Sequence, residues 1–90
     1  MLPPHLIIEV ILQETANVYN MTWQQILKTT IKSSQARCAA LELILQYVDV
    51  ETAADTFSTA ISDVWRNKVV ENNNYTIISR NVESKLKELY

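Results

Sequence analysis

Basic and hydroxyl side chains in two short segments are the groups of this chain best suited to contact a phosphate. The first segment, residues 28–37, carries Lys28, Lys32 and Arg37 and no acidic residue. Clustered cations of this kind are the electrostatic footprint of nucleic-acid binding, and Arg37 could reach into a minor groove. The alternative is a basic face that contacts only solvent. Both interpretations remain open from the sequence.

The second segment covers residues 58–68. Its candidate groups are three hydroxyls and two bases: Ser58, Thr59, Ser62, Arg66 and Lys68. Hydroxyls at the start of a helix can donate to phosphates, since a helix N-terminus favours anions, or they can simply cap the helix. Arg66 is the best candidate for reading a base, because its guanidinium can pair bidentately with guanine. Trp65 is expected in the core, and Asp63 is unfavourable beside phosphates.

Side chains for catalysis or metal binding are sparse. His5 is the only His and Cys38 the only Cys. A pair of these two would lack a third group to orient it, and Cys38 is expected to be a small core residue. Glu9 and Glu14 are five residues apart and do not converge on one metal ion. We therefore expect no enzyme activity, no cofactor, no metal and no small-molecule substrate.

The composition limits the size and the class of fold that the chain can adopt. The 90 residues suit a single domain, 1–90, and 48% of them are hydrophobic, which is enough for one core. The absence of Gly argues against tight hairpins and against Gly-rich phosphate loops. No apolar run reaches the roughly 20 residues that cross a bilayer, and no signal peptide is evident, so we expect a cytoplasmic protein without membrane contact.

Net charge is −2, and residues 38–63 carry five acids and no base. A strong general binder of nucleic acid is usually more basic than this. The acidic run includes Glu51 and Asp55, which weigh against tight DNA binding.

Apolar residues recur at helical spacing through the chain. The pattern predicts helices over about 4–18, 23–28, 33–47, 50–56 and 61–71, and a last helix capped by Thr76. Thr22 and Gln25 form a capping box, Asn20 ends the first helix, Ser33 or Ser34 caps the third, and Asp49 caps the fourth.

We therefore predict an all-α compact bundle of about six helices. The residues at helical spacing in the first helix are Leu6, Ile7, Val10, Ile11, Glu14 and Val18, and all but Glu14 are apolar. The expected core also includes Trp23, Ile26 and Leu27, then Ala36, Ala39, Ala40, Leu43, Ile44 and Tyr47, with Phe57 and Val64 further along.

The order of these features resembles a known family. The pairs Tyr19-Asn20, Ile26-Leu27 and Ala36-Arg37, the basic stretch 28–34, and Phe57 and Val64 occupy places found in the C-terminal DNA-binding domain of the bacterial replication initiator DnaA. That domain is a helix-turn-helix relative of the Trp repressor. The resemblance covers roughly residues 7–89 and implies a helix-turn-helix whose turn lies at residues 57–59.

The chain departs from the family at the turn. The family signature reads Gly-Gly-Arg-Asp-His-Thr-Thr-Val, whereas residues 58–64 read Ser-Thr-Ala-Ile-Ser-Asp-Val, one residue shorter. Recognition of the family's origin box is therefore not implied, and neither is initiator activity. The leading hypothesis is a stand-alone domain that binds double-stranded DNA, in a regulatory or replication-associated role. The alternative is a protein-interaction module on the same scaffold, whose acidic helix pair meets a basic partner.

Overall fold

The computed structural model describes residues 2–28, 33–57 and 73–89, and these residues are helical without any strand. The all-α prediction is confirmed for this part of the chain. Five helices are described, against about six expected, and the helix expected over 61–71 lies outside the described residues. The helices are α1 (Pro4–Tyr19), α2 (Trp23–Leu27), α3 (Ser34–Tyr47), α4 (Val50–Phe57) and α6 (Asn73–Leu89).

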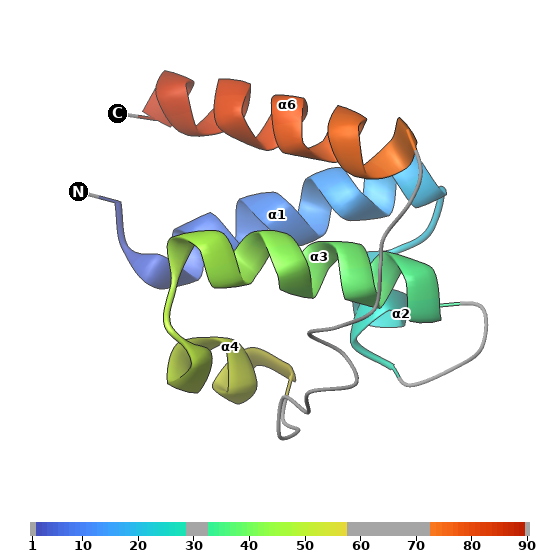
Figure 1. The fold of residues 1–90 in the computed structure, drawn as a ribbon, viewed down its shortest axis with the longest axis horizontal. Helices are drawn as coiled ribbons and strands as arrows, with labels where there is room; N and C mark the ends of the chain where they lie inside the picture. The colour runs from blue at the N-terminus through green and yellow to red at the C-terminus, as the bar shows by residue number, and fades with distance from the viewer. Residues whose placement is uncertain (1, 29–32, 58–72, 90) are drawn as a thin grey trace.

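The helix α1 lies at the centre of the packing, where it contacts α2, α3 and α6. In Figure 1, α6 lies above α1 and runs in the opposite direction, so that both termini lie at the same end of the molecule. The short helices α2 and α4 lie below α3, on the side away from α6 (Figure 1). The fold therefore has one side made by α1 and α6, and another made by α2, α4 and the lower edge of α3.

Asn20 ends α1, as the sequence predicts. Its backbone is left-handed, with φ 56° and ψ 51°, a conformation that Asn tolerates better than most residues. The Met21 N–H donates to the Ala16 carbonyl at 3.0 Å and closes the helix end. At the other end, Pro4 occupies the first helical turn, where its missing N–H costs nothing.

The buried face of α1 differs from the predicted stripe. Ile7 and Ile11 are buried as expected, but the other three apolar residues of the stripe, Leu6, Val10 and Val18, are half-buried. The fully buried set is Ile7, Ile8, Ile11, Leu12, Thr15 and Ala16. Three helices pack on α1 from different directions, so its buried face is rotated toward Ile8 and Leu12. The buried Thr15 hydroxyl donates to the Ile11 carbonyl at 2.7 Å, which satisfies it inside the helix.

The core lies where α3 meets α1 and α6. Leu43 and Phe57 are buried as predicted, whereas Val64 is outside the described residues. Cys38 is buried, in agreement with its expected packing role. The small side chains of Ala36, Ala39 and Ala40 are also buried, which allows the backbones of α3 and its neighbours to approach closely.

Two aromatic residues expected in the core are on the surface instead. Trp23 is 40% exposed and Tyr47 is 41% exposed. The helix α2 has only five residues, and among them Ile26 alone is fully buried. Tyr47 is the last residue of α3, where the chain turns toward α4. Both errors concern residues at the end of a helix, where helical spacing no longer determines which side chain faces inward.

The last helix begins at Asn73, three residues before the predicted Thr76 cap. Tyr75 explains the longer helix, because it packs partly buried against the core. Its hydroxyl accepts a hydrogen bond from Gln46 Nε2 of α3 at 2.7 Å. Burial raises the pKa of the Tyr75 hydroxyl, so this group stays protonated at neutral pH.

Candidate nucleic-acid interface

The capping box at the start of α2 fixes the position of this short helix. Thr22 Oγ1 accepts from the Gln25 N–H at 3.2 Å, and Gln25 Oε1 accepts from the Thr22 N–H at 2.9 Å. This is the reciprocal pair that the sequence predicts. Together with the burial of Ile26, it holds the end of α2, where Lys28 follows.

Ser33 plays a different part from the one predicted. It occupies the residue before α3, but its side chain makes no capping hydrogen bond there. Ser33 Oγ instead donates to the Lys28 carbonyl at 2.6 Å, while the Ser33 carbonyl accepts from the Arg37 N–H at 2.8 Å. The hydroxyl therefore joins the end of α2 to the start of α3. Ser33 is 2% exposed, so this is an interior contact.

Arg37 is the most constrained cation among the described residues, with 3% of its surface exposed. Its Nη1 donates a hydrogen bond to the Leu27 carbonyl, at the last residue of α2. Its guanidinium carbon lies 4.9 Å from the centroid of the Phe57 ring, at the last residue of α4. Burial lowers the pKa of the Arg37 guanidinium, but an arginine remains charged at any physiological pH.

The position of Arg37 corrects the sequence interpretation. A side chain that is 3% exposed and bonded to its own fold does not present its guanidinium to a phosphate or a minor groove. Arg37 instead joins α2, α3 and α4. The sequence carries a signal for this role, since Arg37 is the one charged residue in the otherwise apolar run 36–41.

Of the other candidate contacts, Lys28 is described, and it is exposed at the end of α2. The remaining candidates, Lys32, Ser58, Thr59, Ser62, Arg66 and Lys68, lie outside the described residues. The structure nevertheless brings together the residues that precede the two segments. Leu27 directly precedes Lys28 and Phe57 directly precedes Ser58, and both contact the Arg37 guanidinium.

The helix α4 is acidic on its exposed side. Asp49 caps it as predicted, since Asp49 Oδ1 accepts from the Thr52 N–H at 2.8 Å. Hydrogen bonding with the Thr52 side chain, together with this bond from its N–H, lowers the pKa of the Asp49 carboxyl. Ala53 and Phe57 face the core, whereas Glu51 and Asp55, one turn apart, are exposed. A polyanion that approached this helix from its exposed side would be repelled.

Within the described part of the chain, no three His, Cys, Asp or Glu side chains are placed to hold a metal ion. No helix among these residues is long and apolar enough to cross a membrane. Comparison of the chain with protein-family models, with curated proteins and with solved structures gave no match.

Proposed function

We propose that this domain binds double-stranded DNA. The contact surface consists of the segment that joins α2 to α3 and the chain that follows α4. The observation that carries the proposal is the double contact of Arg37 with the Leu27 carbonyl and the Phe57 ring. Two segments can contact one duplex only if they share a surface. The Arg37 guanidinium contacts the residue before each candidate segment, and this contact supports the proposal.

The chemistry of the two segments suits phosphate contacts followed by base reading. Lys28 is exposed at this surface, and Lys32 follows it in the sequence. In a helix-turn-helix of the DnaA C-terminal kind, α4 is the first helix of the motif and the chain after Phe57 supplies the turn and the reading helix. Ser58, Thr59 and Ser62 then donate to phosphates, and Arg66 and Lys68 reach the groove. The exposed carboxylates of α4 keep the affinity modest.

Fluorescence anisotropy of a labelled duplex tests this proposal. The whole chain is titrated into a random-sequence 20-base-pair duplex at 50 and 200 mM salt. If three phosphates are neutralised, the affinity falls roughly 40-fold between the two salt concentrations, because each contact releases counterions. Binding that does not depend on salt, or no binding to any duplex, contradicts the proposal.

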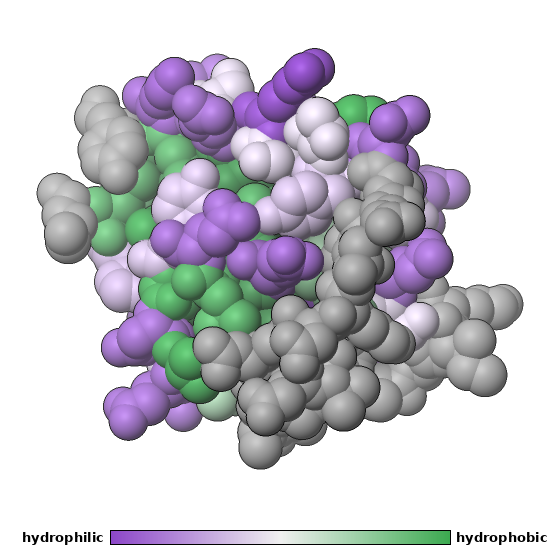
Figure 2. All heavy atoms as spheres, in the orientation of Figure 1, coloured by the Kyte–Doolittle hydropathy of each residue, from purple (hydrophilic) through white to green (hydrophobic). Residues whose placement is uncertain are grey.

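A second candidate function is a protein-interaction module with a basic partner. The observation in its favour is the junction between α3 and α4. Tyr47 and Val50 are 41% and 44% exposed there, beside the exposed carboxylates of Asp49 and Glu51. Figure 2 shows apolar side chains next to strongly hydrophilic ones over this part of the molecule. Elution from a heparin column at low salt favours this candidate, whereas late elution in a salt gradient favours DNA binding.

A further inference from the structure

A groove between α1 and α6 lies away from both surfaces described above. It has a volume of about 230 Å³ and is lined by Leu6, Glu9, Val10, Gln13, Glu14 and Lys85. Five of these six residues belong to α1, and each lies three or four residues from at least one other, so they form one stripe along the helix. This stripe borders the core face of α1 and stays partly open to solvent, since Glu9 and Gln13 are exposed and Leu6, Val10 and Glu14 are half-buried.

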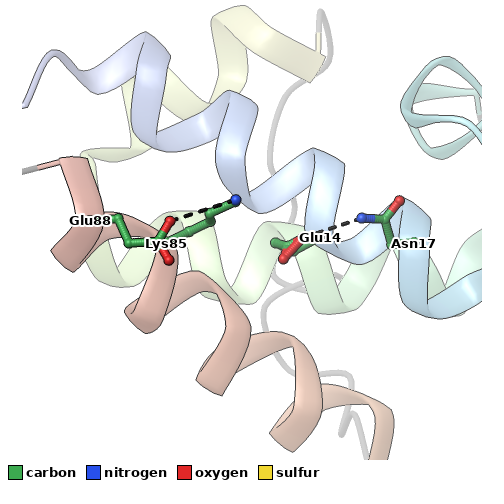
Figure 3. Close-up of polar contacts among 4 residues, drawn as sticks. All are labelled: Glu14, Asn17, Lys85 and Glu88. Carbon is green, nitrogen blue, oxygen red and sulfur yellow. Dashed lines mark hydrogen bonds and ion pairs between the residues drawn. The ribbon is translucent and has the colours of Figure 1, made fainter.

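The floor of the groove is apolar, and the wall formed by α6 leaves this floor open to water. Leu6 and Val10 are half-buried, and Val10 packs against the core. The helix α6 covers α1 with buried Ile78, Val82 and Leu86, but it presents Lys85 to the groove. In Figure 3 the Lys85 side chain extends from α6 toward α1, with Glu14 beside it. A lysine stem, exposed over 56% of its side chain, shields such a floor poorly from water.

The charges around the groove are predominantly negative. Lys85 Nζ lies 3.7 Å from Glu88 Oε2, so the one cation of the groove is already paired within α6. Glu14 Oε2 accepts a hydrogen bond from Asn17 at 3.3 Å (Figure 3). Glu9 is exposed and makes no ion pair with any described residue. Its carboxylate therefore remains available to a cation from outside the chain.

We propose that this groove docks a basic amphipathic helix of a partner protein. The volume is below the range of about 300–1,000 Å³ typical of small-molecule pockets, and it suits one or two apolar side chains. An amphipathic helix inserts such side chains into a groove through residues spaced three and four apart. Lysine or arginine residues beside these anchors meet Glu9 and Glu14. The site lies on the α1–α6 side of the fold, so it leaves the proposed DNA surface free.

A defined peptide tests the docking site without reference to DNA. The probe is a 14-residue peptide of Leu and Lys at helical spacing, and the control peptide has the same composition with the order scrambled. Each is titrated into the ¹⁵N-labelled full chain, and amide shifts locate the contact. We expect the amphipathic peptide to shift resonances of residues 6–14 and of Lys85, and to bind more tightly than its scrambled control.

Matched variants separate the groove from general attraction to an acidic protein. Glu9→Gln is expected to weaken binding about twofold to fivefold, the loss of one partly exposed ion pair. Glu42→Gln removes the same charge from the exposed side of α3 and is expected to leave the affinity unchanged. Equal weakening by both variants, equal binding of both peptides, shifts confined to the α3–α4 junction, or no binding at all overturns the proposal. None of these results depends on whether the chain binds DNA, which the anisotropy titration decides separately.

Discussion

The guanidinium of Arg37 packs on the ring of Phe57, with 4.9 Å between the guanidinium carbon and the ring centroid. A charged group in the interior is costly unless its donors and its charge are satisfied. Here the Leu27 carbonyl accepts a hydrogen bond from one guanidinium N–H, and the electron-rich face of the Phe57 ring attracts the positive charge. One side chain from the first turns of α3 therefore determines how the ends of α2 and α4 are placed relative to each other.

Replacement of Arg37 by Ala is expected to lower the free energy of unfolding by about 2–4 kcal/mol. The change removes a charged hydrogen bond and a cation–π contact and leaves the Leu27 carbonyl without this donor. Urea unfolding followed by circular dichroism measures the loss. Arg80→Ala is the matched control, because Arg80 is exposed on α6, and we expect it to change stability by under about 0.5 kcal/mol. Equal effects of the two variants would refute the interior role of Arg37.

Leu43 tests the centre of the core. It is 1% exposed, and its truncation to Ala should cost roughly 2–5 kcal/mol, the sum of lost burial and a residual cavity. Tyr47→Ala, one turn further along α3, should cost clearly less because Tyr47 is 41% exposed. Thermal unfolding of both variants provides the comparison. A loss at position 43 of well under 1 kcal/mol would be inconsistent with the packing of α3.

Local signals in the sequence predicted the secondary structure well. The capping box at Thr22, the stop at Asn20 and the cap at Asp49 are all present, because each depends on a few neighbouring residues. The inward faces were harder to predict. The face of α1 depends on three helices that pack on it, and neither these partners nor their angles are encoded in the spacing of α1 itself.

The candidate site shows the same difference between local features, which the sequence predicts, and packing, which depends on residues far apart in the chain. The sequence identified Lys28 and Arg37 as cations in a stretch without acids, but it could not tell which of them faces solvent. The answer depends on Phe57, which is 20 residues away from Arg37 in the sequence and adjacent to it in the fold. The apolar residues around Arg37 indicate burial, but its carbonyl and aromatic partners are identified only in the fold.

Asp49 gives the fold a pH dependence of known sign. Its hydrogen bond with Thr52 holds the pKa of this carboxyl below the usual value of 3.8. The ionised cap therefore stabilises the folded state above the ordinary pKa, and its contribution is lost as the pH falls through the lowered folded-state value. Asp49→Asn should keep much of the cap at pH 7 and show a smaller loss of thermal stability than the parent between pH 5 and pH 2. Identical pH profiles would show that Asp49 contributes no such linkage.

Specificity for a DNA sequence should depend on Arg66. If Arg66 reads a base, Arg66→Ala weakens binding to the preferred sequence, obtained by selection from a random pool, by roughly 1–3 kcal/mol more than binding to random DNA. Asp63→Asn should strengthen binding to both, because in the proposed complex it removes a negative charge close to the phosphates. Anisotropy titrations with both duplexes measure these differences. Equal weakening on both duplexes by Arg66→Ala would assign Arg66 to phosphate contact instead.

The salt dependence of binding distinguishes a cation that contacts DNA from a surface cation that does not. Lys28 is exposed at the end of α2, so Lys28→Ala should weaken binding to all sequences about equally. It should also reduce the slope of log affinity against log salt by roughly one unit, since one fewer counterion is released. Lys87→Ala is the control, because Lys87 is exposed on α6 and pairs with Glu83 at 3.3 Å on the other side of the molecule. We expect this control to leave both the affinity and the slope unchanged. If Lys28→Ala and Lys87→Ala alter the slope equally, the contact surface is not the one between α2 and α4.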